Sequence, residues 1–275
     1  MSIHTTKEYF KKKADQYDDV DKQLYWVFSD ELLWFNLKKT LDKQPDSFSF
    51  LDAGGGTGRW TQKILQTYPK SRGILFDLSE SMLRVAENKL KHYEKEGRLK
   101  IIQGNFENPA AIKNLKADVS FNFHNVIGFV KNPSLFISHL VKCTNNQGYI
   151  ISFVPNAYHG MYFNISIGNL GEAKTILRTK KGKFSQEMPS INFFTPDEIK
   201  QLYIKNKLSL IWVTGFPNLI YPNFQETQIS GQTTSLKKLL SVESNYRTLI
   251  EIEKKICVNS DLVARGNNIY IVGRK

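Results

Sequence analysis

The chain has 275 residues, of which 41% are hydrophobic, and 38 Lys and Arg against 26 Asp and Glu give a net charge of +12. This length and apolar content suit one large domain, or a domain with a sizeable insertion, and exclude a disordered protein. No apolar run approaches a membrane span, and the lysine-rich start lacks the apolar region of a signal peptide. Cys143 and Cys257 have no metal-ligand or redox spacing. We therefore expect a cytoplasmic protein without a metal site or a membrane partner.

The positive charge is large enough to attract polyanions such as RNA, DNA or acidic lipid. The lysines are scattered, however, and their densest groups fall at 11–13, 89–100 and 174–183. No RNA-recognition motif, KH domain or zinc-finger signature accompanies them. Nucleic-acid binding is therefore an alternative rather than the favoured prediction, and the sequence carries no signal for an oligomeric state.

The first 45 residues predict a helical lid. Aromatic residues recur near the helical period and predict one helix over 5–18 and a second over 21–41. The second helix is too aromatic for a solvated linker, with a stripe made of Leu24, Tyr25, Val27, Phe28, Leu32, Trp34, Phe35 and Leu37.

Residues 46–275 predict a mainly parallel sheet, because strands and helices alternate along them. The predicted strands lie at 48–52, 73–77, 99–103, 117–123, 148–154, 208–213 and 269–272. An insertion at 155–193 breaks this rhythm, and long insertions usually form lids or binding loops. The stretch 215–232 is irregular, and one long helix is predicted over 235–257.

A glycine-rich turn follows the first of these strands. The strand ends at Asp52, and glycines then stand at 54, 56 and 58, just before a helical pattern. Glycines permit positive φ, and the helix start offers unpaired N–H groups to a ligand. A dinucleotide-binding loop would need its third glycine at 59, which is Arg59. The next strand ends in Asp77, at the place where Rossmann-like folds hold a ribose-binding acid.

The spacing Asp52-x-Gly54-x-Gly56-x-Gly58, with Asp77 after the second strand, resembles motif I of class I S-adenosylmethionine (SAM) methyltransferases. The resemblance covers residues 48–154 by motif and the whole chain by element order. It implies an α/β, Rossmann-like, seven-stranded, mostly parallel sheet with helices on both faces. It also implies that the last strand enters antiparallel, that a helical lid precedes the sheet and that an insertion follows strand five.

The same resemblance implies a SAM site at the strand ends. Motif I would surround the methionine part of SAM, Asp77 would accept from the ribose hydroxyls, and Leu78 would flank the adenine. Asn105 departs from the family's usual aspartate, but its amide oxygen can accept from the adenine amino group. Phe106 either stacks on adenine or packs in the core. The cofactor-binding prediction is Asp52, Gly54, Gly56, Asp77, Leu78, Asn105, Phe106 and His124.

The acceptor would meet the sulfonium methyl after the fourth strand, around His124. A histidine there can act as a general base; the alternative is that its ring packs and its backbone contacts SAM. The Asn/Asp-Pro-Pro-Tyr/Phe motif of base and amide methyltransferases is absent here, and no cysteine follows the strand as in cytosine C5 enzymes. The substrate-binding prediction is Tyr17, Tyr158, His159 and Tyr162.

The sequence thus predicts a SAM-dependent methyltransferase that acts on O, N or C of a small molecule. One alternative is an RNA methyltransferase that uses the basic insertion. The other is a SAM-binding protein that has lost catalysis.

Overall fold

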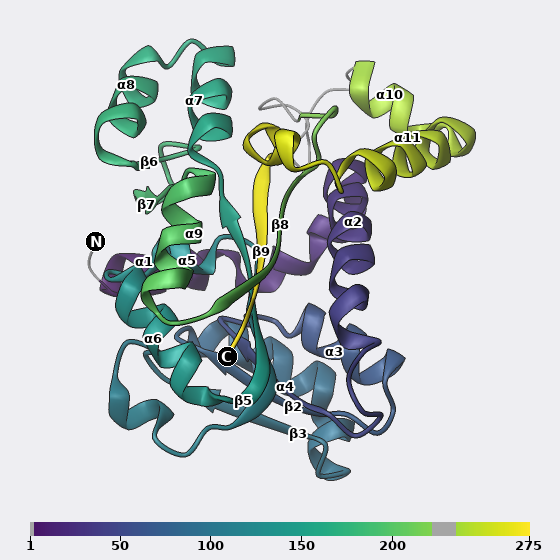
Figure 1. Cartoon of the computed structure of the whole chain (residues 1–275), viewed down its shortest axis with the longest axis vertical. Coiled ribbons are helices and arrows are strands. Elements are labelled where there is room, and N and C mark those ends of the chain that lie inside the picture. The colour runs from purple at the N-terminus through teal and green to yellow at the C-terminus, as the bar shows by residue number, and fades with distance from the viewer. Residues whose placement is uncertain (1–2, 222–234) are drawn as a thin grey trace.

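A computed structural model describes residues 3–221 and 235–275 of the chain (Figure 1). One sheet of seven strands has the order β3-β2-β1-β4-β5-β9-β8. The strands are β1 Ser49–Ala53, β2 Arg72–Asp77, β3 Leu99–Gln103, β4 Ala117–Asn122, β5 Thr144–Pro155, β8 Ser209–Phe216 and β9 Asn268–Arg274. The first five pair in parallel, and β9 runs antiparallel to both β5 and β8. The predicted fold class, including the antiparallel last strand, is confirmed.

The sheet is buried on both faces because successive strand residues are apolar and their side chains point alternately to the two faces. Phe50 and Phe121 point into one core, whereas their neighbour Leu51 points into the other. Helices α3 and α4 cover the first face, and α6 and α9 cover the second. Each fully buried Phe or Leu stabilises the fold by about 1.5–3 kcal/mol. The covering elements are α3 Arg59–Thr67, α4 Glu80–Lys95, η2 Pro109–Ile112, α5 Val126–Phe129, α6 Pro133–Cys143 and α9 Pro196–Lys205.

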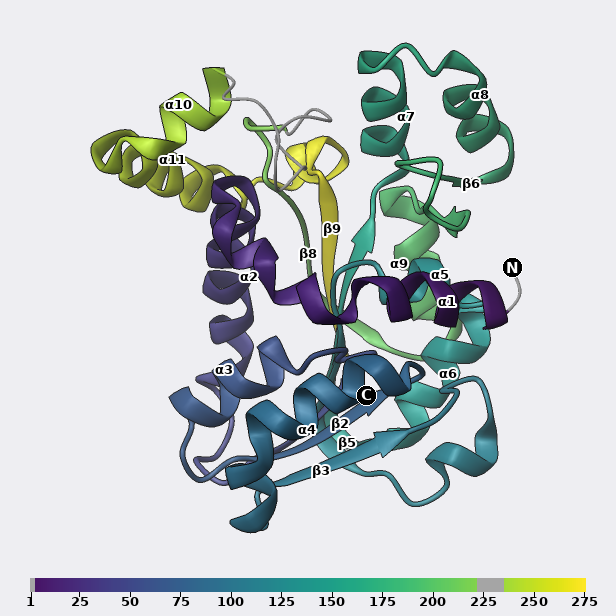
Figure 2. The same cartoon turned by 180° about the vertical axis from the view of Figure 1, so that it is seen from behind.

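The N-terminal segment differs from the prediction in its first helix. It forms α1 Ile3–Lys13, then a 3₁₀ helix, η1 Ala14–Lys22, and then α2 Leu24–Leu41. The expected helix over 5–18 therefore ends as an α-helix at Lys13. Asp18 explains part of this change, because its carboxylate accepts from Thr57 Oγ1 (2.5 Å) and from Lys89 Nζ (2.7 Å). Figure 2 shows α1 lying across the molecule next to α4.

The insertion forms a helical hairpin that stands at one end of the molecule (Figure 1). It consists of α7 Ala157–Ser166 and α8 Leu170–Thr179, followed by the short pair β6 Lys181–Gly182 and β7 Ile191–Asn192. The hairpin has a small core of its own, made of Ala157, Ile176, Met188, Ile191 and Phe193.

The prediction of one long helix over 235–257 is wrong, since the structure has two helices there. These are α10 Ser235–Ser241 and α11 Glu243–Ile256. Val242 is extended between them, with φ −90° and ψ 114°, and β-branched residues favour helices weakly. Both helices pack on α2, and η3 Ser260–Arg265 then leads into β9. Residues 222–232 of the stretch predicted to be irregular lie outside the described residues. Within the described ranges, no helix is both long and apolar enough to cross a bilayer.

Gly58 ends the glycine turn with φ +76°, and a Cβ there would lie 2.6 Å from Leu90 Cδ1 and 2.9 Å from Leu75 Cδ1. Gly97 provides a matched control, because its φ is +68° and nothing lies within 4 Å of its Cβ position. Gly97→Ala should cost about 1–2 kcal/mol of unfolding free energy through backbone strain alone. Gly58→Ala should cost about 1–3 kcal/mol more, because the new methyl group overpacks α4. Urea unfolding measures both losses, and equal losses would contradict the packing role.

Candidate functional site

A cleft opens where the carboxyl ends of β1 and β4 lie side by side and the chain turns to opposite faces of the sheet. This reversal point is where open α/β sheets bind their ligands. Its empty space, counted out to the open mouth, is about 1150 Å³. The sheet contributes the loop after β1 and the tips of β2, β3 and β4, and the lid contributes residues of α1 and η1. Aromatic side chains line much of it, namely Phe10, Tyr17, Trp60, Phe76, Phe106, Phe123, Phe129 and Phe136.

The glycine loop is tied to the end of β2 by its own backbone. Gly54 N donates to Phe76 O (2.7 Å), and Gly55 N donates to the same oxygen (3.2 Å). Gly54 has φ +86°, and a Cβ there would lie 2.5 Å from Val126 Cγ1. Only glycine fits such a position, so the loop backbone faces the cleft without a side chain in the way.

Asp52 and Asp77 place two buried carboxylates on the cleft wall. Asp52 Oδ2 accepts from Thr61 Oγ1 (2.7 Å), and Asp77 accepts from Gly56 N (2.8 Å) and Ser79 N (2.7 Å). Burial, together with the charge of Asp77, raises the pKa of Asp52 to about 7 despite its bond to Thr61. Burial also raises the pKa of Asp77 above its ordinary value. Two desolvated carboxylates gain from a ligand that brings positive charge and hydroxyl donors. SAM carries both, so the residues present fit it, and we propose that they hold it.

The residues predicted to contact adenine follow β2 and β3. Leu78, Asn105 and Phe106 all line the cleft, and their contact with adenine stays a prediction. Asn105 Oδ1 already accepts from Glu107 N (3.0 Å), and an amide oxygen has a second lone pair for another donor. Phe106 is 6% exposed and packs against Phe76, with ring centroids 5.2 Å apart. Phe106 therefore belongs to the core, and only a small part of its ring faces the cleft.

His124 stands at the tip of β4 in a strained backbone. Its φ is +50° and that of Asn125 is +69°, and such conformations in residues other than glycine concentrate at functional sites. His124 lines the cleft. Its Nε2 lies 2.8 Å from Trp60 Nε1 and 3.3 Å from Asp30 Oδ1. The predicted histidine is thus in the cleft, and it is held by residues that the sequence did not single out.

Arg59 is the second feature that sequence reasoning missed. Its Nη2 contacts Asp30 of α2 (2.8 Å) and also Asp21 of η1. Burial pushes the pKa of Asp30 upward, but the pairing with His124 and Arg59 outweighs it and leaves this pKa below its ordinary value. An acid within the apolar stripe of 24–41 was the available signal, because a charged group there needs a buried partner.

Tyr17 is the one predicted substrate residue that the structure brings to the cleft. It lines the wall formed by the lid, together with Thr6, Lys7 and Phe10. Phe10 lies between it and Phe129 of α5, with ring centroids at 6.5 and 5.1 Å. Burial raises the pKa of Tyr17 to about 12, so its hydroxyl stays protonated near neutral pH.

Tyr158, His159 and Tyr162 do not line this cleft. They lie on α7, where Tyr158 and Tyr162 are about half exposed and His159 is buried next to Tyr162 and Tyr221. The reason is that the insertion folds into a hairpin around a small core, which packs against Tyr9 of α1 and Phe129 of α5 beside the cleft and keeps the three predicted residues of α7 away from it. Burial lowers the pKa of His159 to about 3, so this ring stays neutral and is a poor proton acceptor.

The described residues hold no cluster of three or more His, Cys, Asp or Glu that could bind a metal ion. Cys143 and Cys257 are buried free thiols.

A parallel α/β sheet with a glycine loop and two buried carboxylates at its reversal point defines a class of enzymes that bind a nucleoside cofactor. Residues 50–148 match the family described as a methyltransferase domain. The chain is 25% identical over 172 residues to malonyl-[acyl-carrier protein] O-methyltransferase of Halalkalibacterium halodurans, a match that spans 61% of this chain and 62% of that relative. It is 23% identical over 256 residues to tRNA 5-carboxymethoxyuridine methyltransferase of Escherichia coli, across 89% of this chain and 87% of the other.

Solved structures agree in fold. A possible histamine N-methyltransferase from Thermotoga maritima superposes with a TM-score of 0.56 at 15% identity, over 98% of this chain and 99% of that one. The plantazolicin methyltransferase, solved with S-adenosylhomocysteine (SAH), has a TM-score of 0.55 at 18% identity, over 96% and 90%. The matched domain and the shared fold are those of SAM-dependent methyltransferases, and SAM is the cofactor that this fold and these residues fit.

The pKa of Asp52 makes SAM affinity depend on pH. SAM is cationic and favours the ionised carboxylate, but below the pKa of about 7 the free protein holds Asp52 mostly protonated. Binding must then release a proton, so the Kd for SAM should fall by up to about tenfold per unit between roughly pH 5.5 and 7. Calorimetry across this range measures the slope. Asp52→Asn should reduce it, and an unchanged slope in that variant would exclude Asp52 as its source.

Asp77→Ala should abolish tight SAM binding. Two charge-assisted hydrogen bonds to ribose hydroxyls, at about 1.5–3 kcal/mol each, correspond to a loss of at least about 100-fold in affinity. Asp46→Ala is the control, because Asp46 is an exposed acid paired with Lys70 outside the cleft. Calorimetry that finds equal affinity in both variants would refute the assignment.

Proposed function

We propose that this protein transfers the methyl group of SAM to an O, N or C atom of a small molecule bound beneath the N-terminal lid. The observation that carries this proposal is the clasp between the lid and the cofactor loop. Asp18 of η1 binds Thr57 of the loop and Lys89 of α4, and Asp21 binds Arg59. A lid held in this way encloses the acceptor side of the cleft.

The lining of the cleft supports a small acceptor with an apolar part. SAM would occupy the side next to the glycine loop, and the side next to Phe10, Tyr17 and His124 suits an apolar or aromatic group. Residues of the N-terminal lid line this side of the cleft, which favours a small molecule over a polynucleotide.

The proposed reaction needs no covalent bond between the protein and either substrate. SAM supplies a methyl group already activated by its sulfonium, and the reaction is an in-line displacement. The chain binds the donor, aligns the acceptor and excludes water. Such alignment is worth about 7–11 kcal/mol of the barrier. His124 borders the cleft at the end of β4, where a hydroxyl or amine acceptor would have to lose a proton.

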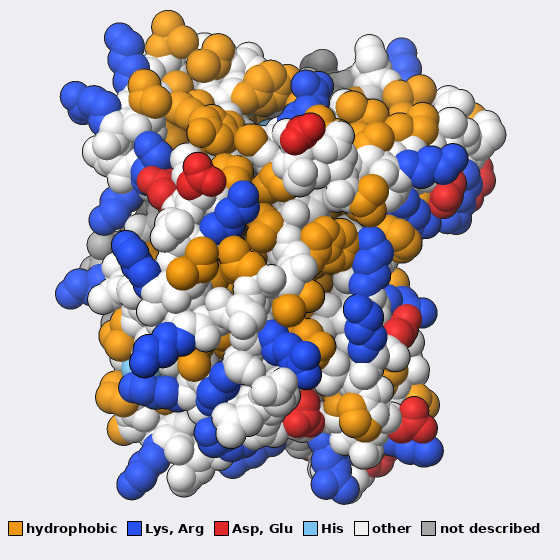
Figure 3. Space-filling view, in the orientation of Figure 1, with side chains coloured by type: hydrophobic (Ala, Val, Ile, Leu, Met, Phe, Trp, Pro, Cys, Tyr) orange, Lys and Arg blue, Asp and Glu red, His pale blue; other side chains and the backbone are white. Residues whose placement is uncertain are grey.

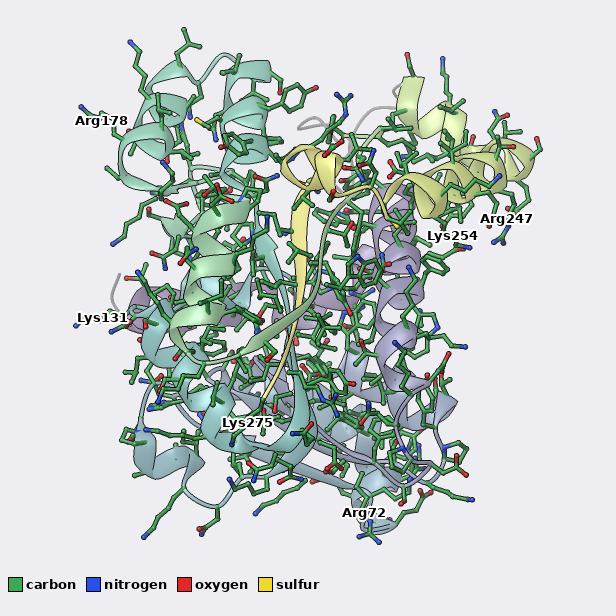
Figure 4. The ribbon with its side chains drawn as sticks, viewed as in Figure 1. Arg72, Lys131, Arg178, Arg247, Lys254 and Lys275 are labelled. Carbon is green, nitrogen blue, oxygen red and sulfur yellow. The ribbon has the colours of Figure 1, made fainter. Side chains whose placement is uncertain are left out.

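A tRNA acceptor is the second candidate, and two observations favour it. The relative that methylates tRNA is matched along most of its length, and basic side chains gather on α8 and the turn after it, at Lys174, Arg178, Lys180, Lys181 and Lys183. Against it, Lys and Arg in Figure 3 are dispersed among acidic and apolar side chains instead of forming one continuous patch on that face. Figure 4 likewise shows Arg72, Lys131, Arg178 and Lys275 on different parts of the molecule.

Methyl-labelled SAM incubated with a fractionated cell extract distinguishes the candidates. Label should appear in a small-molecule fraction and should persist after ribonuclease treatment. The yield should change little between 50 and 200 mM salt, whereas an RNA ligand held by 6–10 phosphate contacts loses about 10³–10⁵-fold in affinity over this range. Label in RNA would establish the second candidate. Tight SAM binding with no labelled product in any fraction would refute both and indicate a non-catalytic SAM-binding protein.

A further inference from the structure

Asp30 is an acid in the middle of an apolar helix, and its two oxygens face different partners. It lies on α2 and is 7% exposed. Its Oδ2 accepts from Arg59 Nη2 at 2.8 Å. Its Oδ1 is buried and makes no hydrogen bond to the described residues, but it lies 3.3 Å from His124 Nε2. The carboxylate is therefore anchored on one side and directed at the imidazole on the other.

Two groups compete for the same ring nitrogen. The indole Nε1 of Trp60 lies 2.8 Å from His124 Nε2. An indole N–H can only donate, and an ionised carboxylate can only accept. If Nε2 carries no hydrogen, it accepts from Trp60 and leaves the Asp30 oxygen without a donor. If Nε2 carries the hydrogen, it donates to Asp30 and Nδ1 keeps its lone pair, but the indole N–H must then turn away from Nε2, because two donors repel each other at that distance.

The charge on Asp30 decides between these two arrangements. Arg59 supplies a donor to one oxygen of Asp30 only, and a buried anion gains more from a second donor than a buried neutral N–H gains from an acceptor. A hydrogen bond to a carboxylate is also stronger than one between neutral groups. Asp30 stays ionised in this network, because Arg59 and His124 together outweigh its burial. The favoured arrangement therefore has the hydrogen on Nε2, shared with Asp30.

We infer that Asp30 is a positioning residue that fixes the tautomer of His124, with Nε2 protonated and Nδ1 free to accept a proton from the acceptor. This inference rests on the proposed function for its catalytic meaning but not for its geometry. During transfer, the acceptor atom forms its bond to the methyl carbon, and the C–S bond breaks with its electron pair left on sulfur. The acceptor's proton passes to Nδ1, and Asp30 stabilises the imidazolium through Nε2.

Arg59 connects this arrangement to the lid. The same guanidinium nitrogen contacts Asp30 and Asp21 of η1. When η1 is seated, Arg59 is held from both sides, and the Asp30 oxygen that faces His124 keeps its direction. Arg59 thus contributes both to holding the lid over the acceptor and to orienting His124.

The test uses Asp30→Asn, because Arg59 fixes which way the new amide points. The guanidinium can only donate, so the amide oxygen must face Arg59 and the amide NH₂ must face His124. Nε2 then meets two donors and must lose its hydrogen, which moves to Nδ1. The control is Glu31→Gln on the same helix, since Glu31 contacts Arg247 and Lys254 on α11.

Nitrogen-15 NMR of the His124 ring reports which nitrogen carries the hydrogen, at a pH where the ring is neutral and without any need for activity. The wild type, Glu31→Gln and Trp60→Phe should all show hydrogen on Nε2, and Asp30→Asn should show it on Nδ1. Hydrogen on Nδ1 in the wild type, or no change in Asp30→Asn, would overturn the inference.

Turnover provides the second measurement once an acceptor is known. Asp30→Asn should lower kcat by at least about 100-fold, the smaller end of what general-base catalysis contributes, with little change in SAM affinity. Glu31→Gln should leave kcat unchanged. A tautomer switch without loss of kcat would leave the positioning role intact but refute base catalysis by His124, and thus separates the two proposals.

Discussion

The bond between Gly56 N and Asp77 Oδ2, at 2.8 Å, is the constraint on which the site depends. It joins the loop after β1 to the tip of β2, and the bonds from Gly54 and Gly55 to Phe76 O act in the same direction. The other oxygen of Asp77 accepts from Ser79 N, next to the start of α4. One carboxylate thus sets the shape of the glycine loop and the entry into the following helix. Because this carboxylate is buried, its remaining capacity to accept hydrogen bonds is directed at whatever fills the cleft.

Arg59 organises the opposite side of the cleft. It follows directly on the glycine turn, yet its partners come from the lid and from α2. The cofactor loop, the lid and the tip of β4 are therefore connected through one side chain, via Asp30 and His124. In the proposed reaction, this arrangement would orient the His124 base through groups that do not themselves touch the methyl acceptor.

Local patterns predicted most of the fold and brought the proposed cofactor residues to one place in it. All seven strands appear where the alternation placed them, and Asp52, Asp77, Leu78, Asn105, Phe106 and His124 line one cleft. Parallel strands bring their carboxyl ends to the same edge of a sheet, so residues that follow such strands meet without further information. The break at Val242 and the 3₁₀ turn at 14–22 depend instead on packing against distant segments.

The acceptor half of the site could not be predicted in the same way. Asp30 and His124 are far apart in sequence, and no periodicity reveals that Arg59 and Trp60 join them. The substrate residues predicted in the insertion do not line the cleft, because aromatic residues at helical spacing fit a hairpin core as well as a substrate pocket. Only the tertiary structure separates these uses, by placing Phe193 against Gly160 inside the hairpin.

The α7–α8 hairpin meets the seven-stranded sheet at the end of β5. Helix α7 follows directly on that strand, and the bridge between Asn156 and Phe194 brings the two ends of the insertion together there. Residues 50–148, where the methyltransferase domain is matched, lie outside the hairpin. A change of length at the tip between α7 and α8 should therefore leave the strand register that shapes the glycine loop in place.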